Sequence, residues 1–181
     1  ITASAANLAA SGAGGVTGTL PIANGGTGAT TLAAAGLSCT PAFQASLSTN
    51  QNPSDDTWTT VTFNTELYDS DGCYDNSSTY AFTPTTAGKY FVYWSLVGDI
   101  SAVPSLKNIS SKIRKNDTSQ FLSYMVNNDN NWVNITSGAS IVVDMNGSSD
   151  YLDVQGYISV SSGNSYFLGG SYFGAYLLIG A

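Results

Sequence analysis

The sequence predicts an all-β protein, an antiparallel sandwich in which one sheet is buried on both of its faces. The first observation is the segment Gly88–Leu96, where Tyr90, Val92 and Trp94 alternate with a second apolar row that begins at Phe91. In a lone sandwich each strand turns apolar residues to the core and polar residues to water. The second observation is the composition, with 12% aromatic but only 9% charged residues, against about 25% charged in an ordinary globular chain. We therefore expect another copy of the chain to cover the second face.

Residues 1–37 are predicted to be an extended stalk, and residues 38–181 a head domain. The stalk is made of Ala, Gly, Thr and Ser with almost no charge, and no aromatic residue precedes Phe43. A single chain of this composition cannot form a core and should be extended or disordered alone. Several chains wound together could bury its small apolar residues, Leu20, Ile22 and Leu32.

A segment of the stalk resembles a known viral sequence. Residues 16–31 read V-T-G-T-L-P-I-A-N-G-G-T-G-A-T-T, which is similar to the T-G-T-L-P-x-A-N-G-G-T-G-A segment that recurs in tail-fibre and receptor-binding proteins of tailed bacteriophages. The alternative is a flexible Gly/Ala linker, which would not require the ordered Leu-Pro-Ile-Ala-Asn core. The resemblance implies a place in a virion, at the distal tip of a phage tail fibre.

From Ser38 onward the pattern changes to strands separated by turns. The predicted strands are Pro41–Leu47, Thr57–Asn64, Ser78–Thr83, Gly88–Leu96, Asn108–Lys115, Gln120–Val126, Ala139–Met145, Asp150–Ile158 and Gly170–Ile179. Asn108–Lys115 and Asp150–Ile158 are apolar on one face and should form an outer sheet. Gly88–Leu96, Ile141–Met145 and Tyr172–Ile179 are apolar on both faces and should form the sheet that meets another copy. The residues predicted to make this interface are Tyr90, Val92, Trp94, Tyr172, Tyr176 and Leu178.

The head resembles the jelly roll of the tumour necrosis factor and complement globular-head superfamily. The residues that carry the resemblance are Pro41-Ala42-Phe43, Val61-Thr62-Phe63-Asn64, Gly72-Cys73-Tyr74-Asp75, Phe82 with Gly88 and Tyr90, and Phe173-Gly174-Ala175-Tyr176-Leu177-Leu178. One departure is Ala175, where the family often has Gly. The resemblance implies an antiparallel jelly-roll sandwich that assembles as a homotrimer.

Little in the chain points to catalysis. There is no His, the commonest general base and metal ligand, and no Gly-x-Ser-x-Gly or phosphate-binding motif appears. The carboxylate pairs Asp69/Asp71 and Asp55/Asp56 could in principle cleave glycosides, but no neighbour would raise one pKa. We predict neither an enzyme nor a cofactor.

The segment Asp69-Ser70-Asp71-Gly72, with Asp75 beyond it, begins like a calcium loop. Its later bidentate Glu is missing, and short Asp/Gly clusters commonly form turns. No metal is therefore predicted, although calcium near a trimer axis stays open. Cys39 and Cys73 are expected to be free thiols rather than a disulfide.

Charge and hydropathy restrict the partners. The net charge of −7 and the pI of about 4.1 would repel a nucleic-acid backbone. No apolar run reaches the ~20 residues of a membrane span. The start at Ile1 has neither an initiator Met nor a basic signal-peptide head, so we expect a fragment of a longer protein.

Alternating strand directions place four loops at the far tip of the head: 66–76, 98–107, 126–138 and 159–169. In one of them Asn128, Asp129 and Asn131 precede Trp132. Amide and carboxylate groups beside an indole are the components of a sugar site. The alternative is that Trp132 anchors the loop in the domain. The further aromatic platforms predicted for the receptor are Tyr68, Tyr74 and Tyr166, and the flank of the trimer is the other place for a ligand.

The predicted function is attachment without turnover. The trimeric head would bind a bacterial surface polysaccharide or outer-surface protein, and weak sites would be strengthened by avidity. One alternative is a structural clamp that registers the stalk during folding. Another is a secreted ligand of the complement or tumour necrosis factor type, which glycosylation would support. Asn-x-Ser/Thr sequons at Asn76, Asn108, Asn116, Asn134 and Asn146 discriminate between these sources, not between mechanisms.

Overall fold

The computed structural model describes Gly26, Gly28, Ala35 and residues 39–100, 106–126 and 134–180. The chain divides into two units, Ile1–Ser38 and Cys39–Ala181, and every described strand belongs to the second unit. The predicted stalk lies outside the described residues apart from Gly26, Gly28 and Ala35. Among the residues described, no helix has the length and apolar character needed to cross a membrane.

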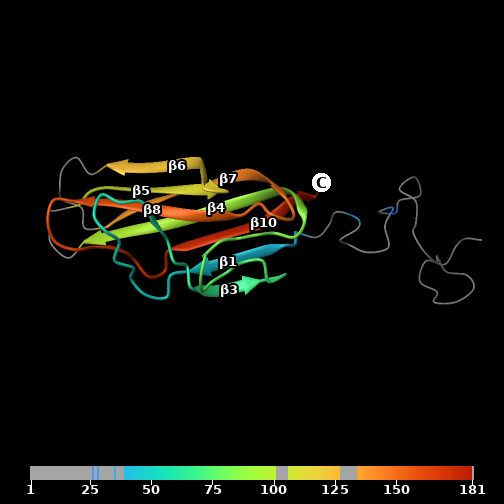
Figure 1. Cartoon of the computed structure of the whole chain (residues 1–181), viewed down its shortest axis with the longest axis horizontal. Helices are drawn as coiled ribbons and strands as arrows, with labels where there is room; N and C mark the ends of the chain where they lie inside the picture. Colours follow the sequence, from blue (N-terminus) through green and yellow to red (C-terminus); the bar gives the residue numbers. More distant parts are fainter. Residues whose placement is uncertain are drawn as a thin grey trace, which may run out of the picture. The chain divides into compact units, whose positions relative to one another are not determined.

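All regular elements in the described residues are strands (Figure 1). They are β1 Ala42–Ser46, β2 Thr59–Thr60, β3 Thr65–Asp69, β4 Ala87–Ile100, β5 Leu106–Lys115, β6 Thr118–Val126, β7 Ile135–Asn146, β8 Leu152–Val160, β9 Ser165–Phe167 and β10 Tyr172–Gly180.

The strands form two antiparallel sheets in a jelly-roll sandwich. One is six-stranded, in the order β3-β1-β10-β4-β7 with β9 also paired to β4, and the other is four-stranded, in the order β2-β8-β5-β6. The chain crosses between the sheets after β1, β2, β4, β6, β7 and β8. The predicted division of strands is confirmed, because β4, β7 and β10 share one sheet while β5 and β8 share the other.

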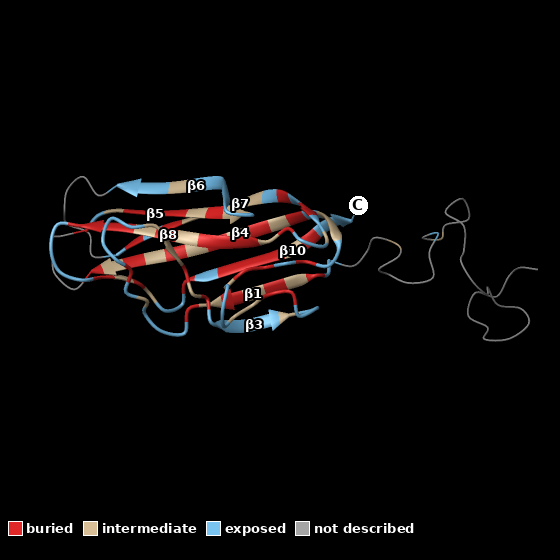
Figure 2. Ribbon diagram, in the orientation of Figure 1, coloured by how far each residue is buried: buried red, intermediate tan, exposed pale blue. Residues whose placement is uncertain are grey.

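The core lies between the two sheets (Figure 2). Its aromatic centre is Phe43, whose ring centroid lies 4.6 Å from that of Tyr74, 4.5 Å from that of Phe82 and 4.9 Å from that of Phe173. Such ring pairs stabilise a fold beyond the burial of their area. Phe43 and Phe173 come from neighbouring strands of one sheet, so the cluster ties the first strand of the domain to the last.

The core also contains a series of linked side-chain hydrogen bonds. The indole Nε1 of Trp94 donates a hydrogen bond to Ser111 Oγ at 2.8 Å, and Ser111 Oγ lies 2.9 Å from Ser137 Oγ. The Ser137 hydroxyl in turn donates to the backbone oxygen of Ser123 at 3.2 Å. These bonds satisfy the indole N–H, which would otherwise be buried without a partner.

Several predicted elements differ from the structure. The strand Thr57–Asn64 shortens to β2, and Ser78–Thr83 is not a strand. Before the latter, the Asp75 carboxylate accepts backbone N–H groups of Ser77, Ser78 and Thr79 at 2.9–3.0 Å, and this fixes a turn. Predicted loops also contain strand residues, since loop 66–76 begins inside the edge strand β3 and loop 159–169 contains β9.

The buried tyrosines make stability depend on pH in alkaline solution. Tyr90 is fully buried, and its hydroxyl donates to the backbone oxygen of Thr86 at 2.8 Å. Burial raises the pKa of Tyr90 to about 12 from an ordinary value of 10.0, and it also raises the pKa of Tyr74. A tyrosine whose pKa is raised in the folded state makes its full contribution to stability below about pH 10, and this contribution is lost as pH rises towards 12.

We therefore expect the free energy of unfolding, measured in urea, to fall between about pH 10 and pH 12. The variant Tyr90→Phe removes one of the titrating groups, so its profile should fall less steeply than that of the parent chain. Identical slopes for the two proteins would contradict a contribution from Tyr90.

Candidate functional site

An aromatic surface covers the outward side of the six-stranded sheet. We call Phe91 and Tyr93 of β4 with Tyr172 and Tyr176 of β10 the aromatic face. The ring centroid of Phe91 lies 5.4 Å from that of Tyr176 and 6.2 Å from that of Tyr93, and Tyr93 lies 6.3 Å from Tyr172. Val142 of β7, in register with Phe91, extends this apolar surface and is exposed.

Gly174 lets the Tyr93 ring lie flat on the sheet. Gly174 is in register with Tyr93, and a Cβ at Gly174 would stand only 2.5 Å from the ring. The Tyr93 hydroxyl donates to Gln44 Oε1 at 3.1 Å. Burial, followed by the hydrogen bond with Tyr68, raises the pKa of Tyr93. The ring is thus held in place in the single chain, and the aromatic face is preformed.

Three of the six predicted interface residues lie on the wrong side of the sheet. Tyr90 and Val92 are 0% exposed and Trp94 is 2% exposed, because all three side chains point into the chain's own core. The outward row of β4 is the other one, Phe91 and Tyr93. Both rows are apolar, so alternation alone could not say which row faces in.

The other three predicted interface residues, Tyr172, Tyr176 and Leu178, do lie on the outward side of β10. Tyr172 and Leu178 are exposed, Tyr176 is half-buried, and the alternate residues Phe173, Ala175 and Leu177 are buried. Their contact with another copy of the chain stays a prediction.

A second apolar surface runs along β6, the edge strand of the four-stranded sheet. This apolar edge consists of Phe121, Leu122, Tyr124, Met125 and Val126, all exposed (Figure 2). Phe121 packs against Trp94 with ring centroids 6.2 Å apart. Long exposed apolar edge strands are normally avoided or covered, so this edge is a candidate contact surface.

The structure does not gather the predicted receptor residues into one site. Asn128, Asp129, Asn131 and Trp132 lie outside the described residues. Tyr68 is exposed on β3 beside Gln44, whereas half-buried Tyr166 lies on β9 beside Asp99. Through the strand register, Tyr68 lies at the level of Tyr93 and Tyr166 at the level of Asp99. These two levels are six residues apart along β4, which corresponds to about 20 Å.

The prediction that Tyr74 forms a surface platform is wrong. Tyr74 is only 6% exposed, stacks on Phe43, and donates its hydroxyl to the backbone oxygen of Phe63 at 2.9 Å.

The prediction that loop 66–76 lies at the far tip of the head is also wrong. β3 runs antiparallel to β1, starting at the level of Ser46 and ending at the level of Phe43. Residues 70–76 therefore lie at the end of the sandwich opposite to the end that holds Ile100, Val126 and Val160.

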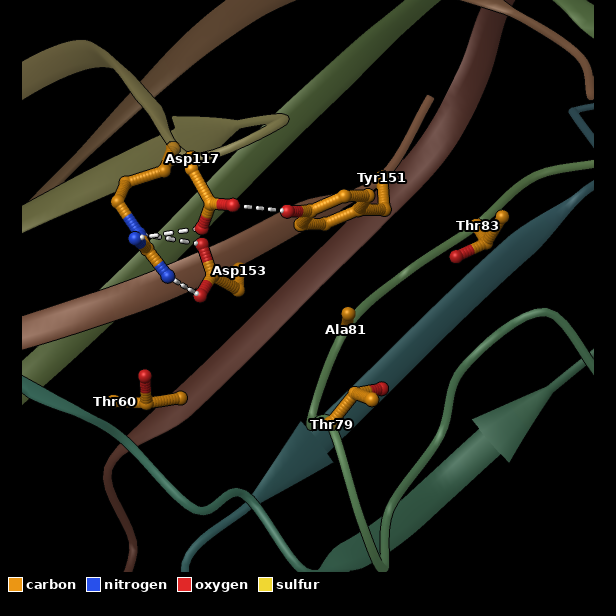
Figure 3. Close-up of a pocket in the computed structure, with 8 residues that line it drawn as sticks. Thr60, Thr79, Ala81, Thr83, Asp117, Tyr151 and Asp153 are labelled. Carbon is orange, nitrogen blue, oxygen red and sulfur yellow. Dashed lines mark hydrogen bonds and ion pairs between the residues drawn. The ribbon is translucent and has the colours of Figure 1, made fainter. Parts of the chain in front are cut away.

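A polar pocket of about 380 Å³ lies beside β5 and β8 (Figure 3). Its lining residues are Thr60, Thr79, Ala81, Thr83, Arg114, Asp117, Tyr151 and Asp153. Arg114 donates two hydrogen bonds to Asp153, one of them from Nε at 2.9 Å, and forms an ion pair with Asp117 at 2.9 Å. Tyr151 donates its hydroxyl to Asp117 at 2.7 Å, which raises the pKa of Tyr151. The charged groups of this pocket therefore pair with one another.

The acidic residues considered for catalysis or calcium are engaged in turns. Asp69 Oδ2 accepts the backbone N–H of Tyr74 at 2.8 Å. Hydrogen bonds from Thr79 and Ser77 lower the pKa of Asp75, and hydrogen bonds from Ser159 and Tyr157 lower that of Asp56. A general acid needs the opposite shift. Within the described residues, no group of three or more His, Cys, Asp or Glu side chains could hold a metal ion. Cys39 is exposed and Cys73 buried, and both are free thiols.

A jelly roll with two unpartnered apolar surfaces has the features of a binding or assembly module. A family model described as "C1q domain" matches residues 42–178. The chain therefore belongs to the C1q-domain family. Domains of this family and of the related tumour necrosis factor family are non-enzymatic ligand or structural modules, and they form homotrimers.

Solved structures share the fold at low sequence identity. The globular domain of a zebrafish complement 1qA protein is 15% identical, with a TM-score of 0.59 over 78% of this chain and 100% of that chain. Eiger TNF from S. frugiperda is 14% identical, with a TM-score of 0.54 over 80% and 96%. Murine APRIL is 10% identical, with a TM-score of 0.56 over 76% and 98%. No curated protein sequence matches the chain.

Proposed function

We propose that this chain forms the head of a homotrimer that attaches to a surface ligand without catalysis. The observation that carries the proposal is the aromatic face, because four rings are held on the outward side of a sheet whose other side already lines the core. Buried aromatic residues are the typical anchors of protein interfaces.

The apolar edge supports a closed ring rather than a two-fold dimer. A two-fold contact uses the same patch on both subunits, whereas a heterologous contact joins two different patches and can close into a ring. The aromatic face lies on one sheet, and the apolar edge is the edge strand of the other. In the proposed trimer the face of each chain packs against the edge of the next, where it contacts Phe121 and Met125, the two edge residues in register with the buried Ile113 and Ile109.

The finer proposal is the tip of a phage tail fibre that binds a host surface polysaccharide or protein. Its support is the segment of residues 16–31 and its resemblance to tail-fibre proteins. A head carried three times on one stalk could turn three weak contacts into firm attachment, because the second and third binding events become intramolecular.

The second candidate is a secreted ligand of the complement or tumour necrosis factor type. The family match and the fold of the solved structures favour it, and glycosylation at the Asn-x-Ser/Thr sequons would support it. The two candidates differ in the cell surface that they would recognise. The clamp hypothesis differs from both, since it requires a trimer but no ligand.

The test begins with light scattering on the full chain and on a chain starting at Ser38. We expect both to have three times the mass of one chain, which is 18.8 kDa for the full chain. Fluorescently labelled trimer is then applied to a panel of bacterial cells and to animal cells. Selective binding to bacteria supports the fibre tip, and selective binding to animal cells supports the secreted ligand. A monomer would refute the trimeric head. A trimer that binds no cell would refute the attachment role and support the clamp hypothesis.

A further inference from the structure

A second pocket lies on the outward side of the four-stranded sheet, and we call it the outer-sheet pocket. It has a volume of about 320 Å³. Its lining residues are Trp58, Asn108, Ser110, Leu122, Tyr124 and Tyr157. None of them belongs to the aromatic face, which lies on the other sheet. Leu122 and Tyr124 belong to the apolar edge, but the register pairs them with Lys112 and Ser110, on the side of β6 opposite to Phe121 and Met125. A ligand here would therefore not compete with a trimer contact made by Phe121 and Met125.

The strand register places a small hydroxyl between two phenol rings. Ser110 of β5 is directly opposite Tyr124 of β6 on one side and Tyr157 of β8 on the other. The Trp58 ring centroid lies 5.4 Å from that of Tyr157. Lys112, two residues along the same face of β5, holds its Nζ 4.0 Å from the Trp58 ring centroid. The pocket therefore has aromatic walls and a polar floor, and a cation lies beside its Trp58 wall.

Two polar atoms of this pocket lack partners. Asn108 Oδ1 and Ser110 Oγ are the buried side-chain atoms without a hydrogen bond in the part of the chain that the structure describes, and Ser110 is only 1% exposed. Buried polar atoms are nearly always paired, so unpaired ones need an explanation. Here both lie in one pocket, which points to a ligand that supplies the missing bonds.

We propose that the outer-sheet pocket binds a pyranose ring of a surface glycan. A pyranose combines apolar C–H faces, which pack on aromatic rings, with hydroxyl groups that donate and accept hydrogen bonds. Trp58, Tyr124 and Tyr157 would contact the ring. Asn108 Oδ1 would accept a hydrogen bond from one sugar hydroxyl, and Ser110 Oγ would form a hydrogen bond with a second hydroxyl. The proposal rests on the proposed function, because it names the ligand class of the attachment head.

Tyr124 provides the way in. The two unpartnered atoms are closed off from solvent, so a ligand must displace a side chain to reach them. Tyr124 is 58% exposed and lies on the edge strand, so we propose that its ring rotates outward to admit the ligand. The entering sugar would then pack between Tyr124 and the pair formed by Trp58 and Tyr157.

The test uses saturation-transfer NMR of the full chain with four probes: methyl α-mannopyranoside, methyl β-glucopyranoside, methyl β-galactopyranoside and methyl β-glucuronide. We expect transfer to at least one of them, strongest at the protons of one ring face. Trp58→Ala should abolish it. Ser110→Ala should weaken binding about tenfold, the effect of one hydrogen bond. Because that hydroxyl is unpaired in the free protein, Ser110→Ala should keep Tm or raise it by roughly 2–4 °C.

The matched control is Ser111→Ala, the neighbouring serine of the same strand. Ser111 faces the core and accepts the Trp94 indole N–H, so this variant should lose stability and keep the affinity for the sugar. A second control, Tyr166→Ala, removes a ring of the six-stranded sheet that does not line the pocket, and it should keep binding.

Three outcomes would overturn the glycan site: no transfer to any of the probes, unchanged binding by Ser110→Ala and Trp58→Ala, or loss of binding in Tyr166→Ala alone. The outcome is separable from the proposed function. A trimer without sugar binding refutes only the pocket, whereas a monomer that binds the sugar refutes only the assembly.

Discussion

The double variant Phe91→Glu/Tyr176→Glu is expected to be a folded monomer, with a mass of one chain rather than three by light scattering. Both side chains lie on the outward side of the six-stranded sheet. Two carboxylates there would have to be buried without partners in the proposed interface, which costs several kcal/mol for each charge. In the single chain both carboxylates face water, so circular dichroism should still report the native sheets.

The control is Trp58→Glu, which adds one negative charge on the outward side of the four-stranded sheet and should remain a trimer. A double variant that keeps the trimeric mass would show that the aromatic face is not the contact. Such a result would also remove the argument that the face of one chain packs against the edge of the next.

Replacing Arg114 by Met is expected to destabilise the domain by about 3–5 kcal/mol, the cost of leaving one buried charge without its partner. The side chain of Asp153 is only 5% exposed and that of Arg114 16% exposed. Loss of the guanidinium leaves the Asp153 carboxylate buried and unpaired. Tm should fall by roughly 10 °C, and urea unfolding at neutral pH measures the free energy directly.

The surface pair of Lys89 and Asp144 provides the control. Its Nζ to Oδ1 distance is 2.6 Å, but the two side chains are 51% and 75% exposed. Lys89→Met should therefore cost no more than about 1 kcal/mol. Adding Asp153→Asn to Arg114→Met should recover much of the lost stability, since no charge is then buried. If the two single variants, Arg114→Met and Lys89→Met, lose equal stability, the buried pair has no special role.

The sequence was sufficient for the fold because its strongest signals are periodic. The two apolar rows of β4 and the closing strand β10 predicted a sandwich and its division into two sheets. The edge strand β3 was missed, because Glu66 and Asp69 on an exposed strand look like a loop. Edge strands bury little, so they need little apolar periodicity.

The sites were harder to predict because they depend on register. Which row of β4 faces the core depends on how the two sheets pack. Tyr74 lies in a turn-rich segment and is buried because its ring packs on Phe43 and its hydroxyl bonds to the backbone of Phe63, two contacts distant in sequence. The outer-sheet pocket exists because Tyr124 and Tyr157, from two other strands, lie opposite Ser110. No local pattern in the sequence encodes such a pairing.

The position of β10 has a consequence for how the domain folds. β10 lies between β1 and β4, so the first strand cannot join the sheet until the last one is available. Pairings between strands so distant in sequence give a high contact order and slow folding. During synthesis, β4 and β7 can pair early, while β1 and its Phe43 ring wait with apolar surface exposed. The head should therefore complete its core late, when most of the domain has left the ribosome.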